Sequence, residues 1–417
     1  MSLWNVPENT RHAWSERLDK FCVICGALVP AGLVVGNIGF ESLVSLGGLG
    51  WIVRWFISRE RPGQGLWAHP LVKPWLLWYL VIVTSMIFNG PGSKGWGHDL
   101  IFFRYFLFGF ALLDISRRIP VPSYFFYGLA AGVIWAALNT LSAYIFHYDL
   151  LGKPLVRYTG KLKEASRISA MAAYAAPLFS LLGIPRSRRR AHQGKLWRNG
   201  IGIAAFLLVL QTHVRTSFLA ACAGIMFQAA WILGQRRTFK KLVYVFLPVA
   251  VAALVSFYFF RKTTIFSLSH LYDRIYYWKV AWAMWTEHPV LGVGISSFQD
   301  VYKQVASSGA VSGVVAPGGV VHEVLEETHA HNLIFMLLAS TGLAGLGAFA
   351  WLFINALRMI IRGAGVTPVE LVSWPVVFLV MGLTGFNIYH SWYQALLTFF
   401  LVWIGSAHDP KRFTAED

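Results

Sequence analysis

The sequence predicts an all-α, polytopic membrane protein with about twelve transmembrane helices and one large loop, containing amphipathic helices, on the non-cytoplasmic side. Three observations support this fold class. Of the 417 residues, 56% are hydrophobic and only 13% are charged, which is about half the charged fraction of an ordinary soluble domain. Apolar runs long enough to cross a bilayer recur along the whole chain. Basic segments fall in every second connection between these runs, as the positive-inside rule requires.

The apolar runs define the expected spans, because a membrane-spanning helix needs about 20 mainly apolar residues. Some boundaries follow from helix breakers such as Asn89-Gly90-Pro91-Gly92,. The neighbouring runs 199–212 and 215–233 are also compatible with one broken helix. The predicted spans are residues 20–37, 39–57, 71–89, 98–114, 122–143, 165–183, 199–212, 215–233, 241–259, 332–356, 370–387 and 391–407.

Basic connections orient the chain in the membrane. They alternate with the other connections, so placing them in the cytoplasm puts both termini there as well. Two long segments, about 144–164 and about 260–330, then lie on the outer side. The basic connections are SRERPG (58–63), ISRRIP (115–120), PRSRRRAHQGKLWR (185–198), GQRRTFKK (234–241) and RMIIRG (358–363).

The second outer segment is too long for a plain turn, and loops of this length are usually functional. Within it, residues 271–294 carry apolar and aromatic side chains at helical spacing, which predicts an amphipathic helix near the outer interface,. His288-Pro289 ends that pattern. The small residues of 307–320 fit a lid over a site and an unstructured connector equally well.

Three regions follow from these spans. Residues 1–259 hold the first nine predicted helices, residues 260–330 form the large outer loop, and residues 331–417 hold the last three helices and a cytoplasmic tail. The chain contains no P-loop and no G-x-G-x-x-G that opens a helix after a strand,. An ATP-driven activity within this chain is therefore not expected.

Basic residues on the outer side run against the usual charge bias and indicate an anionic ligand. Phosphate and diphosphate groups would supply the reason, because arginine donates two parallel hydrogen bonds to phosphate oxygens and stays charged. Arg157 and Lys161 in the first outer segment, and Arg274 and Lys279 in the second, are candidates for this role. Contact with outer-leaflet head groups explains any single lysine equally well.

Two further arginines lie at or within predicted spans. Arg215 stands alone in THVRTSFLA (212–220), at the outer start of a span. Arg104 lies inside HDLIFFRYFLFGF (98–110), more than one turn below the outer surface. An arginine within the bilayer is costly and is by default a functional hypothesis. Snorkelling toward the interface, or pairing with Asp99, is an equally good explanation of Arg104.

The stretch ETHAHNLIFMLLASTGLAG (327–345) places two histidines directly before a long apolar run. Thr328 is the expected cap of a helix that begins near His329 to Asn332. His331 would then lie in the first turn, where the helix dipole disfavours the imidazolium. A neutral histidine is the state that a general base needs. Asn332 and His329 are candidate supporting residues.

Two alternatives remain open for these histidines. His322, Glu327, His329 and His331 together could bind a metal ion, although their spacing is not that of H-E-x-x-H. They could also be ordinary histidines at a membrane interface.

A family resemblance favours the catalytic interpretation. His331-Asn332, nine residues, then Gly342-Leu-Ala-Gly345 resembles the signature of bacterial O-antigen ligases. The loop stretch TEHPVLGVGISSFQ (286–299) is similar to a segment found before that histidine in O-antigen ligases and polymerases. THVRTSFLA resembles the stretch with the family's essential arginine, although Val214 stands where serine is usual. The resemblance covers about residues 199–350, and the N-terminal half matches in hydropathy only.

The resemblance implies glycosyl transfer at the periplasmic face of a bacterial inner membrane, without cofactor, metal or nucleic acid. The donor would be an undecaprenyl-diphosphate-linked O-antigen, and the acceptor a sugar hydroxyl of the lipid A core. His331 would be the base and Arg215 would stabilise the leaving diphosphate, with Arg274 as second choice. Backside attack would invert the anomeric centre. The residues 153–167 would contact phosphates of either substrate.

Other functions remain as alternatives. An O-antigen polymerase, or an enzyme that transfers the glycan to a protein, shares the same superfamily, and the single late loop with His-Asn favours the ligase. A transporter of lipid-linked glycans belongs to a different class. It would predict charged residues along several spans toward the midplane, and apart from Arg104 the predicted spans are nearly free of charge.

Overall fold

The computed structural model describes residues 7–58, 64–90, 92–93, 95–152, 165–179, 192–212, 214–234, 269–317, 319–362 and 369–407. Within these residues the chain is helical apart from one two-stranded hairpin. The elements are α1 (Glu8–Val35), α2 (Asn37–Ser58), α3 (Gln64–Ala68), α4 (Val72–Asn89), α5 (Trp96–Leu100), α6 (Phe103–Ile115), α7 (Val121–Phe146), α8 (Ala165–Leu178), α9 (His192–Gln211), α10 (Arg215–Gly234), α12 (Ser269–Glu287), α13 (Phe298–Ser307), β1 (Val314–Val315), β2 (Val321–His322), α14 (Leu333–Arg362), a 3-10 turn (Val369–Ser373), α15 (Trp374–Thr384) and α16 (Ser391–Ala407).

The all-α, multi-pass membrane architecture is confirmed. Five helices in the described part of the chain are long and apolar enough to cross a membrane: α1, α2, α4, α7 and α14. Helices α6, α8, α9, α10, α15 and α16 lie at further expected spans. The expected span 241–259 lies outside the described residues, so the number of twelve spans stays a prediction.

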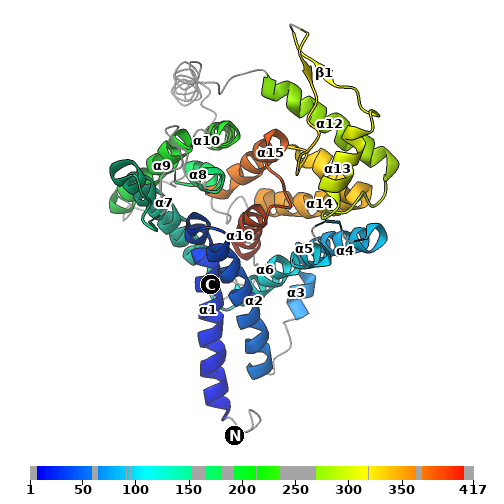
Figure 1. The fold of residues 1–417 in the computed structure, drawn as a ribbon. Helices are drawn as coiled ribbons and strands as arrows, with labels where there is room; N and C mark the ends of the chain where they lie inside the picture. Colours follow the sequence, from blue (N-terminus) through cyan, green and yellow to red (C-terminus); the bar gives the residue numbers. More distant parts are fainter. Residues whose placement is uncertain are drawn as a thin grey trace.

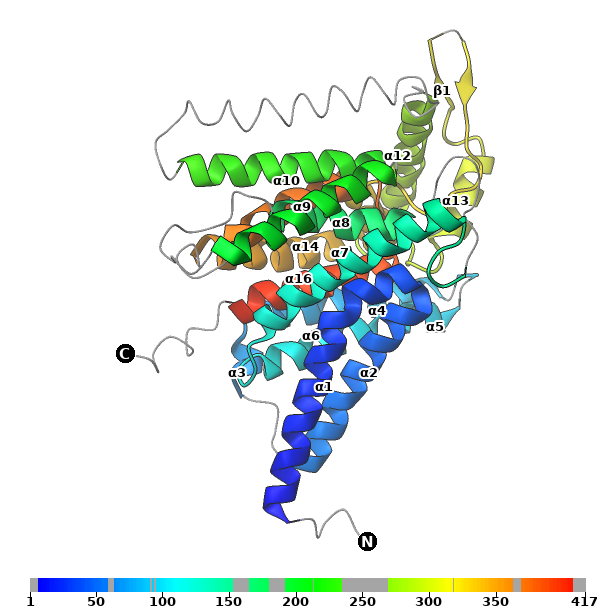
Figure 2. The same ribbon diagram turned by 90° about the vertical axis from the view of Figure 1, so that its left-hand side faces the viewer.

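The helices form an array with the large loop gathered at one end (Figure 1). Helices α7, α8, α9 and α10 run alongside one another, and α12, α13 and the hairpin lie together at one end of them (Figure 2). Helix α12 packs on α14, and α10 packs on α8 and α15. The segments that the sequence assigns to the outer side therefore meet the starts of α10 and α14.

The large loop is mostly ordered into short elements. The amphipathic helix expected within residues 271–294 is confirmed as α12, which ends at Glu287, directly before His288-Pro289. Over its described residues, the stretch 307–320 is not an unstructured connector. It leads into a short antiparallel hairpin, in which Val314 pairs with His322 and Val315 with Val321. Valines at the paired positions favour strands even within a glycine-rich stretch.

Helix α14 is broken at Gly342, which has φ 62° and ψ −162°. Residues 289–294 fill this break. The Val293 amide donates to Ala339 O at 2.8 Å, and the Leu343 amide donates to Pro289 O at 2.9 Å. A Cβ at position 342 would lie 2.2 Å from Val290 O. Gly342 therefore lets another backbone enter an interrupted helix,.

A buried ion network ties α1, α2 and α6 together. Arg54 Nε lies 3.2 Å from Asp19 Oδ1, and Arg118 lies 2.8 Å from Asp19 and 3.1 Å from Asp114. Trp51 donates its indole hydrogen to Asp114. Arg54 and Asp114 lie near the ends of predicted spans, whereas Asp19 and Arg118 lie just outside them. Two carboxylates and two guanidiniums neutralise one another here, which makes their burial tolerable.

Candidate functional site

Arg215 is the first residue of α10 and faces a cavity of about 330 Å³. The cavity opens at the end of the array where the loop lies, and α8, α10, α12 and the 385–386 segment form its walls. Its lining residues are Ser166, Val214, Arg215, Thr216, Asp273, Arg274, Tyr277, His331, Gly385 and Phe386. Arg215 and His331 are more than a hundred residues apart in the sequence, and both line this one cavity, as expected for residues of a shared site.

Helix α12 brings Arg274 and Tyr277 to the same cavity, because residues three apart share a helix face,. Burial lowers the pKa of Arg274, yet an arginine remains charged at any working pH. Burial, together with the nearby carboxylates of Glu327 and Asp273, raises the pKa of Tyr277 to about 12. The cavity therefore offers three hydrogen-bond donors: the guanidinium groups of Arg215 and Arg274, and the protonated phenol of Tyr277.

His331 stands just outside helix α14 in the left-handed region, with φ 51°. Its Nδ1 lies 3.2 Å from Gly385 O, and since a carbonyl only accepts, Nδ1 is the nitrogen that donates. The ring stacks on Tyr277, with centroids 5.3 Å apart. Two neighbours from distant elements thus hold the imidazole, and the neutral form so bound carries its lone pair on Nε2.

The expected helix start is wrong by a few residues. Helix α14 begins at Leu333, and Asn332 caps it, because its Oδ1 accepts from the Ile334 amide at 2.9 Å and the Phe335 amide at 3.3 Å. Asn332 also donates to Leu383 O at 3.2 Å, which ties α14 to the end of α15. Thr328 instead turns its hydroxyl to Glu327 and His329. His331 therefore lies before the first turn, not within it.

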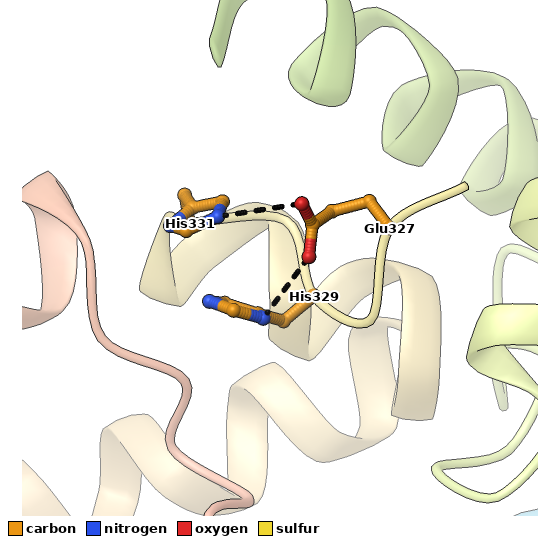
Figure 3. A group of neighbouring side chains, drawn as sticks. All are labelled: Glu327, His329 and His331. Atoms are coloured by element: carbon orange, nitrogen blue, oxygen red, sulfur yellow. Dashed lines mark ion pairs between the residues drawn. The ribbon is translucent and has the colours of Figure 1, made fainter. Parts of the chain in front are cut away.

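Glu327, His329 and His331 form a cluster beside the cavity (Figure 3). Glu327 Oε2 lies 3.8 Å from His331 Nε2, and Glu327 Oε1 lies 3.5 Å from His329 Nδ1. The two imidazole rings are 3.9 Å apart between centroids. Burial alone would raise the pKa of Glu327, but His331, the Thr328 amide and His329 together lower it to about 2. The carboxylate is thus ionised at any ordinary pH.

Comparison with known families identifies the central part of the chain. Residues 200–350 match the family model described as O-antigen ligase. Residues 200–350 therefore belong to the O-antigen ligase domain family. No curated protein matches the chain. The matched segment includes Arg215, Arg274, Glu327 and His331, so the family resemblance seen in the sequence is confirmed, and with it a multi-pass membrane glycosyltransferase of ligase or polymerase type.

The two family stretches on either side of the site touch each other directly. Residues 289–294 of the loop enter the break at Gly342 of α14, and the Gly294 amide donates to Ser340 O at 2.9 Å. Ser85 and Asn89 of α4 hold the same loop by donating to Leu291 O and Gly292 O. The loop stretch and the Gly342 stretch of the matched segment therefore build one junction within α14.

The remaining candidates fall outside the cavity. Arg104 pairs with Glu41 at 3.3 Å and not with Asp99, which accepts from Ser296. Lys279 donates to Ser312 O and lines a separate aromatic groove. His322 pairs with Asp273 at 2.8 Å. Arg157 and Lys161 lie outside the described residues.

Several wall residues carried no sequence signal. Gly385 and Phe386 belong to the connection between α15 and α16, which sequence analysis counted as part of a span. Ser166 and Thr216 are small polar residues of a common kind at helix starts. Tyr277 offered the one usable hint, since it lies one turn from Arg274 on the same face of the predicted amphipathic helix.

Proposed function

We propose that this O-antigen ligase family enzyme moves O-antigen glycan from undecaprenyl diphosphate to a sugar hydroxyl of the lipid A core. The observation that carries the proposal is the single cavity lined by Arg215, Arg274 and His331. A diphosphate leaving group needs cationic donors, and a sugar hydroxyl needs a base. One site offers both kinds of side chain.

The proposed step is an inverting displacement. The acceptor hydroxyl gives its proton to Nε2 of His331 while its oxygen forms a bond to the anomeric carbon. The bond between that carbon and the diphosphate oxygen breaks, and the electron pair leaves with the diphosphate. A positioned base is typically worth about 100- to 10,000-fold in rate. No nucleotide and no metal ion enters this step.

Arg215 and Arg274 stabilise the leaving diphosphate in this mechanism. Charge develops on its bridging oxygen as the sugar bond breaks, and fixed guanidinium groups stabilise such charge by about 100- to 1000-fold each. Tyr277 donates a further hydrogen bond, because its phenol is protonated up to about pH 12. Asn332 supports the site by capping α14.

Glu327 assists the base in this scheme. When His331 accepts the proton it becomes an imidazolium, with Gly385 O at one nitrogen and the Glu327 carboxylate 3.8 Å from the other. The arrangement supports a base whose charged product is stabilised where it forms.

The membrane topology belongs to the same proposal. Twelve spans, both termini in the cytoplasm and the 260–330 loop in the periplasm would place the cavity at the outer face of the bacterial inner membrane. There it would meet two lipid-anchored substrates. Residues 1–259, 260–330 and 331–417 would be the first helices, the loop and the last helices with a cytoplasmic tail.

Complementation of a ligase-deficient strain tests the function. Wild-type protein should restore a ladder of O-antigen-capped lipopolysaccharide on gels, whereas His331→Ala and Arg215→Ala should not, at equal membrane abundance. A ladder from a folded His331→Ala protein would contradict the base assignment. Longer glycans on the lipid carrier without capped core would favour a polymerase, and glycan on a protein would favour a protein O-oligosaccharyltransferase.

A transporter of lipid-linked glycan remains the alternative from a different class. It predicts that purified protein, given donor and acceptor in one detergent micelle, forms no new glycosidic bond. Product formation under those conditions would exclude it, because no second compartment exists.

A further inference from the structure

The cluster beside the cavity has the donor set of a metal site. Glu327, His329 and His331 each offer one donor atom, and these three atoms all lie within 4.8 Å of one another. In a tetrahedral zinc site with bonds of about 2.0 to 2.1 Å, neighbouring donors are about 3.3 Å apart. Glu327 Oε1 lies 3.5 Å from His329 Nδ1, and Glu327 Oε2 lies 3.8 Å from His331 Nε2, so each carboxylate oxygen is close to that spacing from one imidazole nitrogen.

The groups behind these donors orient them as a metal would require. His331 donates its Nδ1 hydrogen to Gly385 O, so Nε2 is the ligand atom in the neutral ring. A histidine ligand usually donates its other nitrogen to a carbonyl or carboxylate in this way. Glu327 accepts from the Thr328 amide at 2.7 Å, which holds the carboxylate beside both rings, with one oxygen toward each (Figure 3).

The charges around the cluster are compatible with a cation. The carboxylate of Glu327 lies beside both rings, whereas Arg215 and Arg274 line the cavity, to which Glu327 and His329 do not contribute. The start of α14 is unfavourable for a cation, because its amides form the positive end of the helix dipole. Asn332 Oδ1 accepts from two of those amides and so reduces this effect.

We propose that Glu327, His329 and His331 bind Zn²⁺ and that the bound ion inhibits glycosyl transfer. Two imidazoles and one carboxylate suit Zn²⁺, and leave its fourth position open, while Mg²⁺ and Ca²⁺ prefer oxygen donors. Inhibition rests on the proposed function, since the ion occupies the Nε2 lone pair that the base uses. Binding does not rest on it.

Binding is measured on the purified full chain in detergent with Co²⁺ as a spectroscopic probe. Wild-type protein should show the visible absorption of a four-coordinate Co²⁺ site, which one equivalent of Zn²⁺ abolishes and Mg²⁺ leaves unchanged. His329→Ala should bind at least about 100-fold more weakly, because a ligand matters more than a second-shell group. His322→Ala is the matched control and should bind like wild type.

Equal binding by wild type and His329→Ala would overturn the site. Loss of binding in His322→Ala with retention in His329→Ala would overturn it as well.

Inhibition is measured on the transfer reaction. Zn²⁺ should inhibit wild-type transfer over the same concentrations at which it displaces Co²⁺, and a chelator should restore the rate. The transfer activity of His329→Ala should be insensitive to Zn²⁺ at the concentration that halves the wild-type rate. Stimulation by Zn²⁺ would overturn the inhibitory site.

Zinc that binds at the cluster without slowing transfer would contradict His331 as the base, while leaving the metal site intact. Failure of the site and failure of the proposed function therefore give different results.

Discussion

The two sides of His331 differ in charge. On the cavity side lie the hydrogen-bond donors Arg215, Arg274 and Tyr277, together with the Asp273 carboxylate, which pairs with His322. On the other side lies the Glu327 carboxylate, with His329 beside it. Arg274 and Tyr277 come from the loop helix and Arg215 from a helix start, whereas Glu327 and His329 belong to the six residues that precede α14.

This difference is informative because glycosyl transfer separates two charges. A diphosphate gains negative charge as it leaves, and the acceptor oxygen loses a proton. Hydrogen-bond donors on the cavity side stabilise the negative charge that develops on the diphosphate. A carboxylate near Nε2 of His331 stabilises the proton taken from the acceptor oxygen. The imidazole of His331 lies between the cavity arginines and the Glu327 carboxylate. It can accept the proton while the arginines keep their charge for the diphosphate.

The largest effect is expected from removing the positive charge of Arg215 on the cavity side of His331. Arg215→Ala should slow transfer by about 100- to 1000-fold, because a fixed cation at the leaving group is lost. Arg215→Lys keeps the charge but not the two-pronged geometry, so it should fall between wild type and alanine. Rates are compared in purified protein at equal folded fraction. An Arg215→Ala enzyme within a few-fold of wild type would remove the cationic side from the mechanism.

A smaller loss is expected on the other side. Glu327→Gln keeps the shape of the side chain but removes the charge near Nε2, and an interaction with a charged group is worth about 1.5 to 3 kcal/mol. Transfer should slow by about 10- to 100-fold, with the loss mainly in kcat if the imidazolium forms only during reaction. A change confined to KM would assign Glu327 to substrate binding instead.

Glu327 should also make stability depend on pH. Its folded pKa is about 2, against 4.5 for the ordinary carboxyl. A depressed pKa stabilises the fold fully above the unfolded value, and this stabilisation is lost as pH falls from about 4.5 through about 2. Thermal unfolding followed by tryptophan fluorescence should show a wild-type advantage over Glu327→Gln at pH 6 that shrinks toward pH 3. A constant difference would contradict the ionised carboxylate.

The smallest effect is expected from Lys279, which lies on neither side. Its ammonium donates to Ser312 O beside an aromatic groove and does not line the cavity. Lys279→Ala should change transfer by less than about 3-fold, because an exposed lysine of this kind contributes little. A loss of transfer rate comparable to that of Arg215→Ala would show that Lys279, outside the cavity, also contributes to binding the diphosphate.

Much of the site was accessible from the sequence because its signals are local. A lone arginine at the start of an apolar run, and histidines directly before another, stand out against a background of 13% charged residues. The amphipathic pattern of 271–294 placed Arg274 on a helix, and α12 ends directly before His288-Pro289, as predicted. Only the roles of these residues remain predictions.

Other features depend on contacts between distant segments. The Gly342 break becomes intelligible once residues 289–294 are seen to enter it. Arg104 suggested a pair with Asp99 five residues away, but its partner is Glu41 on α2. Asp19 and Asp114 are far apart in the sequence, and both pair with the same arginine, Arg118.

The sequence by itself determined the membrane class, the family of residues 200–350 and the side chains able to do chemistry. These follow from hydropathy and short motifs, which depend only on neighbours along the chain. Tertiary structure alone decided that Gly385 O would hold Nδ1 of His331 and that Glu327 would face Nε2. The direction of an imidazole is set by whichever acceptors packing brings near it, and the Gly385 carbonyl is a backbone group with no side-chain signature.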